Sequence, residues 1–500
     1  MCKKYIFLYC AYPIFILFCN GGDFMNITNN LEDNVQKIRA ALKLGESFDI
    51  LERIITVHDT TFYLYYLDGF MKDTNLEYVR RDMVNISEDI FKTIKTAKEL
   101  SEKAISSVEV ATEKNLDKII MALLSGQTIL LGPNFDEALI IDVRTYETRG
   151  TEEPEKEKVL RGAHDGFVET LVINTSLIRR RIRDPHLVFE MNSVGDISRT
   201  DVVIAYMRNK VDKKTLEKVK NAVKDLKVDA LTMGDQSLVE AIHSYSTCNP
   251  FPKARYTGRP DVAAAHIMEG KVVILVDNTP TALILPTNIF DFMQSVDDYY
   301  MPVITGNYLR LIRYIVFFTN LLISPLFILF TDNPQWIRGS ALDFLLPDVA
   351  YAIPIFLQFI ILEIALDGLN LASLNTPDAL GTSLSIIGGL ILGDFAVQTG
   401  WFIPHTILYE AVIAISSFDQ PSIELTYAFK FSRLLLVLLT GLFGFWGFIA
   451  GVIIIVVVIT LTKTFTGEPY LYPLIPFNAN ALWHLLFRTR LSEKQKVDSK

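Results

Sequence analysis

The sequence predicts a cytoplasmic α/β domain of two subdomains, followed by an all-α domain that crosses the membrane several times. Its 500 residues exceed what one hydrophobic core usually serves. Half of the residues are apolar and yet 21% are charged, which indicates that charged and lipid-compatible residues are segregated along the chain. Apart from a short run near the start, the long apolar stretches all lie in residues 309–462.

Composition and motifs argue against several classes of function. The formal net charge of -9 is the wrong sign for a nucleic-acid-binding protein. Three of the four cysteines lie in the first 19 residues and only Cys248 lies in the body, so neither a disulfide framework nor a zinc site is expected. Phosphate-loop, dinucleotide-binding, zinc-protease and hydrolase motifs are missing from the sequence. We therefore predict no enzyme, no catalytic residue, no cofactor and no metal.

One short motif has a faint catalytic likeness. Asp277-Asn278-Thr279-Pro280 resembles a loop in which an aspartate is phosphorylated, but Asn278 and Pro280 replace the lysine and glycine of such loops. We interpret it as a β-turn capped by Asp277.

The first 24 residues form an apolar extension. Lys3 and Lys4 precede an apolar run over residues 5–19, which is too short to span a membrane comfortably and lacks a small-residue cleavage site. We expect translation to start at Met25, with an uncleaved membrane anchor as the alternative.

Residues 25–308 alternate between helical and strand patterns, as in an α/β domain. Helices are predicted over residues 87–124 and 212–226. Strands are predicted over residues 128–131, 138–143, 201–207 and 228–231, with a hairpin over 272–276 and 281–285. The two subdomains are expected to divide near residues 185–200.

The most basic patch lies in this part of the chain. Arg179, Arg180, Arg181 and Arg183 could bind anionic lipid headgroups or an acidic partner. The alternative is a solvated helix face whose arginines pair with neighbouring acids such as Asp184.

Residues 309–462 form the predicted membrane domain, with about four crossings. Spans are predicted over residues 309–330, 349–366, 384–402 and 434–461. Residues 402–417 are shorter and could be re-entrant. The last span is longer than the bilayer is thick and must tilt or project.

Charges at the ends of this domain predict its orientation. Arg310 and Arg313 flank the first span, and the tail of residues 463–500 is basic, so both are expected in the cytoplasm.

Small and acidic residues stand out within the membrane domain. Gly441, Gly444, Gly447 and Gly451 lie near one helical stripe, which favours close helix packing; a flexible or kinked helix is the alternative.

Residues 339–429 contain nine acids and no lysine or arginine, and three of the acids, Glu363, Asp394 and Glu410, lie in apolar segments. With no cation in this segment, a permeating cation or proton is a natural counter-charge, so we predict an ion pathway. Alternatively, these acids lie near helix ends or are protonated and hydrogen-bonded for structural reasons.

Several long motifs in order resemble the A-subunit family of bacterial spore germination receptors (GerA type). They occupy residues 132–150, 177–190, 250–286, 385–402 and 469–483. The stretches RRRIRDP and PYLYPLIPFNA are most similar to the stage V sporulation protein AF branch of that family. One departure concerns Glu363: family members often carry an arginine a few residues after the matching glutamate, whereas Ala365-Leu366-Asp367-Gly368 follows here.

This resemblance implies a membrane protein of the spore inner membrane that takes part in monovalent cation release during germination. It implies a homo-oligomeric ion channel, a pentamer, that works with other germination membrane proteins and contacts membrane lipids. A non-conducting scaffold that assembles germination receptors is the alternative. A secondary transporter is a third hypothesis, but the inverted repeat that it requires is not evident.

Overall fold

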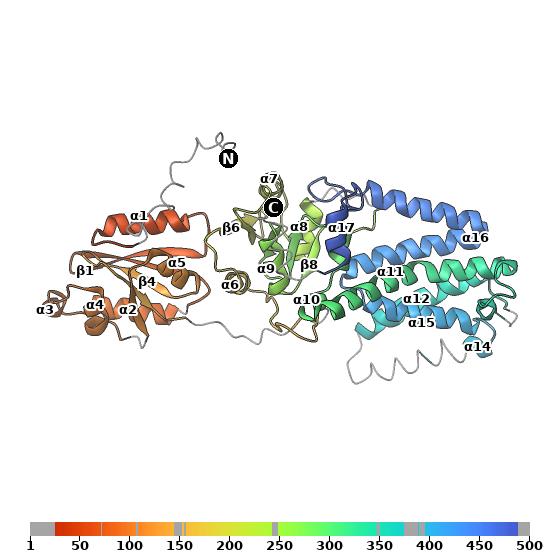
Figure 1. The fold of residues 1–500 in the computed structure, drawn as a ribbon, viewed down its shortest axis with the longest axis horizontal. Coiled ribbons are helices and arrows are strands. Elements are labelled where there is room, and N and C mark those ends of the chain that lie inside the picture. The colour runs from red at the N-terminus through yellow and green to blue at the C-terminus, as the bar shows by residue number, and fades with distance from the viewer. Residues whose placement is uncertain are drawn as a thin grey trace, which may run out of the picture. The chain divides into compact units, whose positions relative to one another are not determined.

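The chain forms two compact units (Figure 1). The computed structural model describes residues 26–71, 73–106, 109–144, 153–154, 157–242, 249–347, 351–374, 389 and 396–488, so the 1–24 extension lies outside it. The α/β unit comprises Met1–Pro154, Asp165–Leu238 and Thr257–Leu283. The helical unit comprises Glu155–His164, Val239–Tyr256 and Ile284–Lys500.

The first sheet of the α/β unit is antiparallel and has helices on both faces. Its strand order is β1-β2-β4-β5-β3. The strands are β1 (Ile50–Val57), β2 (Thr60–Leu67), β3 (Val110–Glu113), β4 (Thr128–Leu131) and β5 (Ala138–Ile141). Helices α1 (Leu31–Leu42) and α5 (Leu116–Leu124) bury one face, and α2 (Asp73–Val84) and α4 (Ala97–Ala104) bury the other. The sheet is stabilised by two apolar cores, one on each face.

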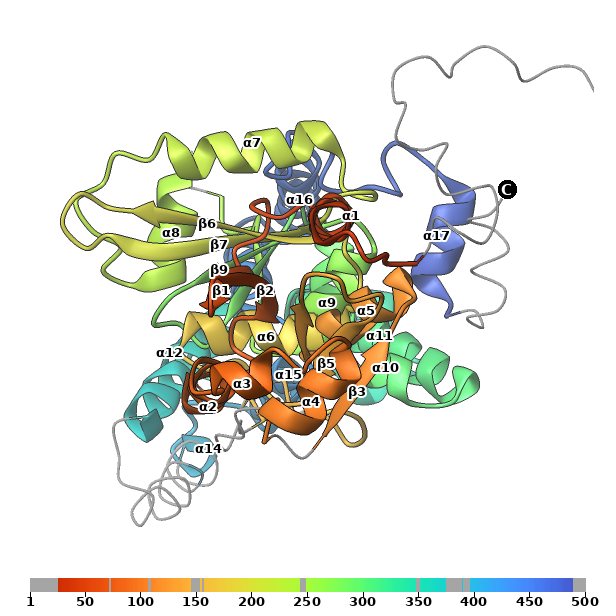
Figure 2. The same ribbon diagram turned by 90° about the vertical axis from the view of Figure 1, so that its left-hand side faces the viewer.

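The second sheet has the strand order β6-β7-β9-β10-β8. Its strands are β6 (Leu187–Val194), β7 (Thr200–Met207), β8 (Arg255–Thr257), β9 (Val272–Val276) and β10 (Ala282–Leu285). Helix α7 (Lys213–Lys224) covers one face, and α6 (Leu171–Arg181) and α9 (Pro260–Met268) lie on the other (Figure 2). The predicted strands at 201–207, 272–276 and 281–285 and the helix at 212–226 are confirmed.

Three predictions for this unit need correction. Residues 87–124 form not one helix but α3 (Glu88–Phe91), α4, β3 and α5, because Thr96 and Asn115 cap new helix starts and β3 pairs with β5. Residues 228–231 form no strand, and the carbonyls of Val228 and Asp229 instead accept hydrogen bonds from the turn after β6. The boundary expected near residues 185–200 falls on β6, so the two sheets divide earlier in the chain.

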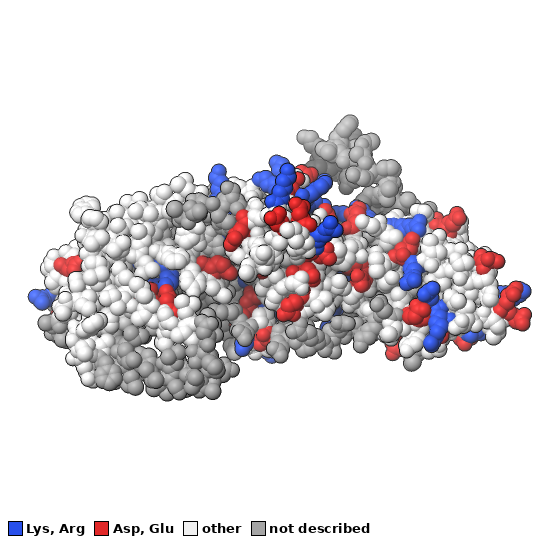
Figure 3. Space-filling view, turned by 180° about the vertical axis from the view of Figure 1, so that it is seen from behind, with Lys and Arg blue, Asp and Glu red and all other residues white. Residues whose placement is uncertain are grey.

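The helical unit contains, in its described residues, three helices long and apolar enough to cross a membrane. They are α11 (Val303–Asp332), α12 (Ile355–Leu374) and α16 (Ile423–Leu461), and the shorter α15 (Pro404–Phe418) matches the segment expected over residues 402–417. The face shown in Figure 3 carries few charged side chains over the helices. The span predicted at 384–402 lies mostly outside the described residues.

Helix α16 is two antiparallel arms rather than the single long span predicted at 434–461. Gly444 has φ 58° and ψ -136°, torsion angles that L side chains rarely adopt, and the chain reverses there (Figure 1). A Cβ on Gly447 would lie 1.9 Å from the carbonyl oxygen of Leu439, and one on Gly451 would lie 2.7 Å from Leu436. Such contacts require the second arm to pack back along the first.

Three of the four predicted packing glycines therefore lie at close contacts. Gly447 and Gly451 join the two arms of α16, and a Cβ on Gly441 would meet the ring of Phe356 on α12. A Cβ on Gly444 would meet no described residue within 4 Å, and this glycine instead allows the chain to reverse. The absence of a side chain matters at the first three positions for space, and at Gly444 for backbone torsion.

Replacing Gly447 by alanine is expected to lower the thermal melting temperature of the purified protein. The added methyl meets the backbone of Leu439, which cannot move without opening the α16 hairpin, and overpacking of this kind costs about 1–3 kcal/mol. Gly368→Ala on α12 is the matched control, because a Cβ there meets no atom of the described residues within 4 Å. The control is expected to melt at or slightly above the wild-type temperature. Equal melting of the two variants would contradict close packing at Gly447.

The start of α11 and the segment after α16 meet at the same end of the helical unit. Arg310 Nη1 donates to the carbonyl of Leu485 at 2.8 Å, and the Arg488 backbone N–H donates to Asn307 Oδ1 at 2.6 Å. The guanidinium of Arg488 also donates to the carbonyl of Asp298 at 2.7 Å. These bonds fix where the chain leaves the bundle.

Candidate functional site

Charged side chains from two membrane helices meet in the interior of the helical unit. Glu363 of α12 is 7% exposed and accepts from Arg433 Nη2 of α16 at 2.5 Å. Its other carboxylate oxygen lies 2.8 Å from Lys430 Nζ, also on α16. Lys430 forms a further ion pair with Asp367, the most exposed member of the group.

Helical spacing explains why these four residues come together. Glu363 and Asp367 are four residues apart on α12, and Lys430 and Arg433 are three apart on α16, so each pair lies on one face of its helix. Packing α12 against α16 then brings two acids opposite two cations.

Two further helices complete the cluster. Arg433 also donates to the side-chain and backbone oxygens of Asn320 on α11. Glu410 of α15 is 3% exposed, and its carboxyl lies within hydrogen-bonding reach of Glu363. We call Asn320, Glu363, Asp367, Glu410, Lys430 and Arg433 the intramembrane charge cluster.

A separate polar contact holds α15 in position. Gln358 of α12 is fully buried, and its Oε1 accepts from the backbone N–H of Ile403 at 3.1 Å and from Thr406 Oγ1 at 2.9 Å. Thr406 lies one helical turn before Glu410, so the same face of α15 that contacts Gln358 also presents Glu410 to Glu363.

The charge balance of the cluster is uneven. In the part of the chain that the structure describes, three carboxyl groups, those of Glu363, Asp367 and Glu410, are gathered around two cations, Lys430 and Arg433. When all are ionised, one negative charge is uncompensated inside the helices. An excess carboxylate in a region of low dielectric attracts a proton or a small cation.

The predicted pathway residues are only partly brought together. Glu363 and Glu410 meet, whereas Asp394 lies outside the described residues. The counter-charge for Glu363 was expected to be a permeating ion, but Lys430 and Arg433 provide it from within the chain. They were missed because they follow immediately after the segment without lysine or arginine; their three-residue spacing in an apolar stretch was the available signal.

The four arginines of the basic patch do not share one surface. Arg179 is fully buried and forms an ion pair with Asp49 at 2.8 Å, so it is not available to lipid or to a partner. Arg181 is partly buried and pairs with Asp165. Arg180 and Arg183 are exposed.

The residues of the predicted turn after β9 have structural roles. Asp277 Oδ1 accepts the backbone N–H of Leu171 at 3.2 Å, which caps the first turn of α6. Asn278 has a positive φ of 64°. Within the described residues, no group of three or more potential metal ligands of the His, Cys, Asp and Glu types is found.

Comparison with known proteins gives consistent matches over nearly the whole chain. The sequence model of the family described as Bacillus/Clostridium GerA spore germination protein matches residues 36–499. Stage V sporulation protein AF of Bacillus subtilis (strain 168) is 36% identical over 468 residues, 93% of this chain and 94% of that protein. Spore germination protein KA of the same strain is 29% identical over 467 residues, 92% of this chain and 85% of that protein.

One solved structure with a similar fold region is a domain of a germinant receptor subunit. The crystal structure of the N-terminal domain of the A subunit of the Bacillus megaterium spore germinant receptor GerK3 matches with a TM-score of 0.37 and 20% identity. The match covers 52% of this chain and 95% of that chain.

Proposed function

Because the chain belongs to the GerA family of spore germination proteins, we propose that it is a subunit of an oligomeric membrane ion channel of endospores. In this proposal the channel releases monovalent cations during germination. The subunits form a homo-oligomer, a pentamer, in the spore inner membrane, in contact with lipids and other germination membrane proteins. The α/β unit and the segment after α16 lie in the cytoplasm, in keeping with Arg310 and Arg313 at the start of α11.

The intramembrane charge cluster is the observation that supports conduction most directly. Its three carboxyl groups and two cations leave one negative charge uncompensated within apolar helices. Charged groups at membrane depth are costly, and they usually mark an ion or proton path. In this proposal a passing cation interacts with Glu363 and Glu410 by displacing Lys430 or Arg433. The ion pairs of Lys430 and Arg433 therefore oppose the conducting state.

Potassium flux through the protein in liposomes tests this proposal. Glu363→Gln is expected to reduce the flux at least tenfold, because it removes the carboxylate that both cations contact. Asp343→Asn is the matched control: this carboxylate is exposed in the same unit and outside the cluster, so its flux is expected to equal that of the wild type. Lys430→Met is expected to increase cation flux, since it leaves the cluster more negative.

The non-conducting scaffold is the second candidate. The ion pairs of Glu363 with Lys430 and Arg433 favour it, because a fully paired carboxylate can serve helix packing alone. A scaffold predicts no potassium flux from folded wild-type protein, and a Glu363→Gln variant that changes assembly rather than flux. Oligomer mass in detergent, measured beside the flux, separates the two functions.

A further inference from the structure

Large apolar side chains are exposed in α17 (Ala479–Leu486) and in the segments that flank it. Single exposed apolar side chains are normal on a protein surface, but a concentration of them marks contact with a partner or a membrane. The rings of Trp483 and Phe487, one helical turn apart, have centroids separated by 4.5 Å. We call the exposed set the C-terminal apolar surface: Tyr472, Leu474, Ile475, Phe477, Trp483 and Phe487.

Helix α17 is apolar on two sides. Leu482 and Leu485 are partly buried, as expected of the side that packs on the protein. A helix at the boundary between protein and water normally has polar side chains on its outer side. Next to Asn480, however, the outer side of α17 carries Trp483 and Phe487. This side therefore fits an apolar or interfacial medium better than water.

Hydrogen bonds hold α17 level with the first turns of α11. The carbonyl of Leu485 accepts from Arg310, and the backbone N–H of Arg488 donates to Asn307. Figure 1 shows α17 at the end of the helical unit where α11 begins. Because α11 is long and apolar enough to cross a membrane, α17 lies where α11 would enter the bilayer.

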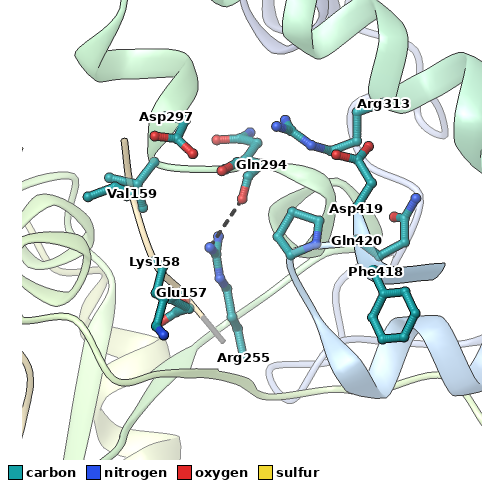
Figure 4. A pocket seen from close by; sticks show the side chains of 13 residues that line it. Glu157, Lys158, Val159, Arg255, Gln294, Asp297, Arg313, Phe418, Asp419 and Gln420 are labelled. Carbon is teal, nitrogen blue, oxygen red and sulfur yellow. Dashed lines mark hydrogen bonds between the residues drawn. The ribbon is translucent and has the colours of Figure 1, made fainter. Parts of the chain in front are cut away.

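The two arginines of α11 at this level point into the protein. Arg310 and Arg313 are both buried, and Figure 4 shows the Arg313 side chain reaching between Gln294 and Asp419 in a polar pocket. The side chain of Tyr308, in the same turns of α11, is instead exposed. The outer surface at this level is thus aromatic and aliphatic rather than cationic.

The four tryptophans of the chain lie at two opposite ends of the helical unit, and all are 49–74% exposed. Trp336 follows the end of α11, Trp401 precedes α15, and Trp446 lies beside the reversal of α16. The ring of Trp336 contacts that of Phe445, so the first and third lie at the same end. Trp483 lies at the other end. Tryptophan is enriched at both surfaces of a membrane.

The separation of these two ends matches a bilayer. Asn307, which is bonded to the residue chain after α17, and Asp332, where α11 ends, are 25 residues apart in one helix. At 1.5 Å per residue, this is a rise of about 38 Å. A bilayer is about 30 Å thick in its hydrocarbon core and about 40–45 Å with its headgroups. The level of α17 is therefore that of the headgroups.

We infer that the C-terminal apolar surface lies in the headgroup region of the lipid bilayer, with Phe477, Trp483 and Phe487 at the boundary with the acyl chains. Lipid covers this surface, because the surface is level with the start of α11 and about one bilayer thickness from the other three tryptophans. Helix α17 is then an interfacial anchor that fixes how deeply α11 enters the membrane. The inference does not rest on ion conduction.

Fluorescence quenching of the full-length protein in liposomes tests this placement. Combining Trp336→Phe, Trp401→Phe and Trp446→Phe leaves Trp483 as the single tryptophan. Phospholipids brominated near the glycerol end of their acyl chains quench tryptophans at the membrane surface, and acrylamide quenches those in water. The reference carries Trp483→Phe and Tyr78→Trp in the same background, since Tyr78 is exposed in the α/β unit. Relative to this reference, Trp483 is expected to be quenched at least threefold more by brominated lipid and at least threefold less by acrylamide.

Two further variants make the outcome decisive. Phe477→Trp with Trp483→Phe moves the single tryptophan to another part of the surface, is expected to behave like Trp483, and serves if the first variant does not fold. Leu442→Trp with Trp483→Phe is the reference for lipid, because Leu442 is exposed on an apolar arm of α16. The inference is overturned if acrylamide quenches Trp483 as it quenches the Tyr78→Trp reference, which means water. It is also overturned if neither quencher reaches Trp483, which means that a protein partner or a second copy of the chain covers it.

Discussion

Arg433→Met is expected to destabilise the protein by about 3–5 kcal/mol, because it leaves a carboxylate buried without its main partner. Arg433 is itself buried and joins Glu363 of α12 to Asn320 of α11. Among the described residues, its loss leaves Lys430 as the one cation that pairs with Glu363 and with Asp367. The melting temperature of the purified protein in detergent is expected to fall by roughly 5–10 °C.

A matched control and a double variant show whether the loss of stability comes from the unpaired charge or from lost packing. Arg338→Met changes an exposed arginine of the same unit, and its melting temperature is expected to stay close to that of the wild type. Combining Arg433→Met with Glu363→Gln removes both partners, so the double variant is expected to be more stable than Arg433→Met alone. A double variant as unstable as the sum of the two single variants would refute the ion pair as the source of the loss.

Arg179→Met is expected to be equally damaging in the α/β unit. Arg179 holds Asp49 with two hydrogen bonds, from Nε at 2.8 Å and from Nη2 at 3.1 Å. The same guanidinium donates to the carbonyls of Asp184 and Leu187 and lies 5.0 Å from the centre of the Phe189 ring. Because Asp49 is only 2% exposed, its charge has no access to water once Arg179 is gone. A cost of about 3–5 kcal/mol follows.

Arg183→Met is the control for this prediction. Arg183 lies four residues later and is exposed, so its replacement is expected to change the melting temperature little. Arg179 joins the segment just before β1 to the segment that leads into β6, so limited proteolysis between the two sheets is expected to accelerate in Arg179→Met. Unchanged melting and unchanged proteolysis would show that this ion pair does not hold the two sheets together.

The regular elements of the α/β unit were predictable where local patterns and tertiary pairing agree. The strands predicted at 128–131 and 201–207 are apolar throughout except for their first residues, Thr128 and Asp201. Helix α7 follows an N-cap, Asp212, that is visible in the sequence. Strand β3 was not predictable, because its residues, Val110–Glu113, are half exposed and become a strand only by pairing with β5. The surrounding residues have helical periodicity, so the sequence predicted a helix over this segment.

The site was predictable in its acids but not in its cations. Glu363 and Glu410 are conspicuous because they interrupt apolar segments, and both prove to be buried. Arg433 lies just before the span predicted to begin at residue 434, whereas α16 begins at Ile423 and places this arginine well inside the helix. The partner of a buried charge can be identified only once the helix ends are known, since moving a boundary by ten residues moves a side chain about 15 Å along the axis.

The torsion angles of Gly444 also have a consequence for how the protein is made. If residue 444 were helical, α16 would run straight for 39 residues, on the order of 60 Å, and the chain after Thr462 would emerge on the side of the bilayer opposite to the start of α11. The bonds of Arg488 to Asn307 and to Asp298 would then be impossible. We therefore expect the two arms to enter the bilayer together as a helical hairpin during biogenesis, so that Gly444 determines on which side of the bilayer the end of the chain is released.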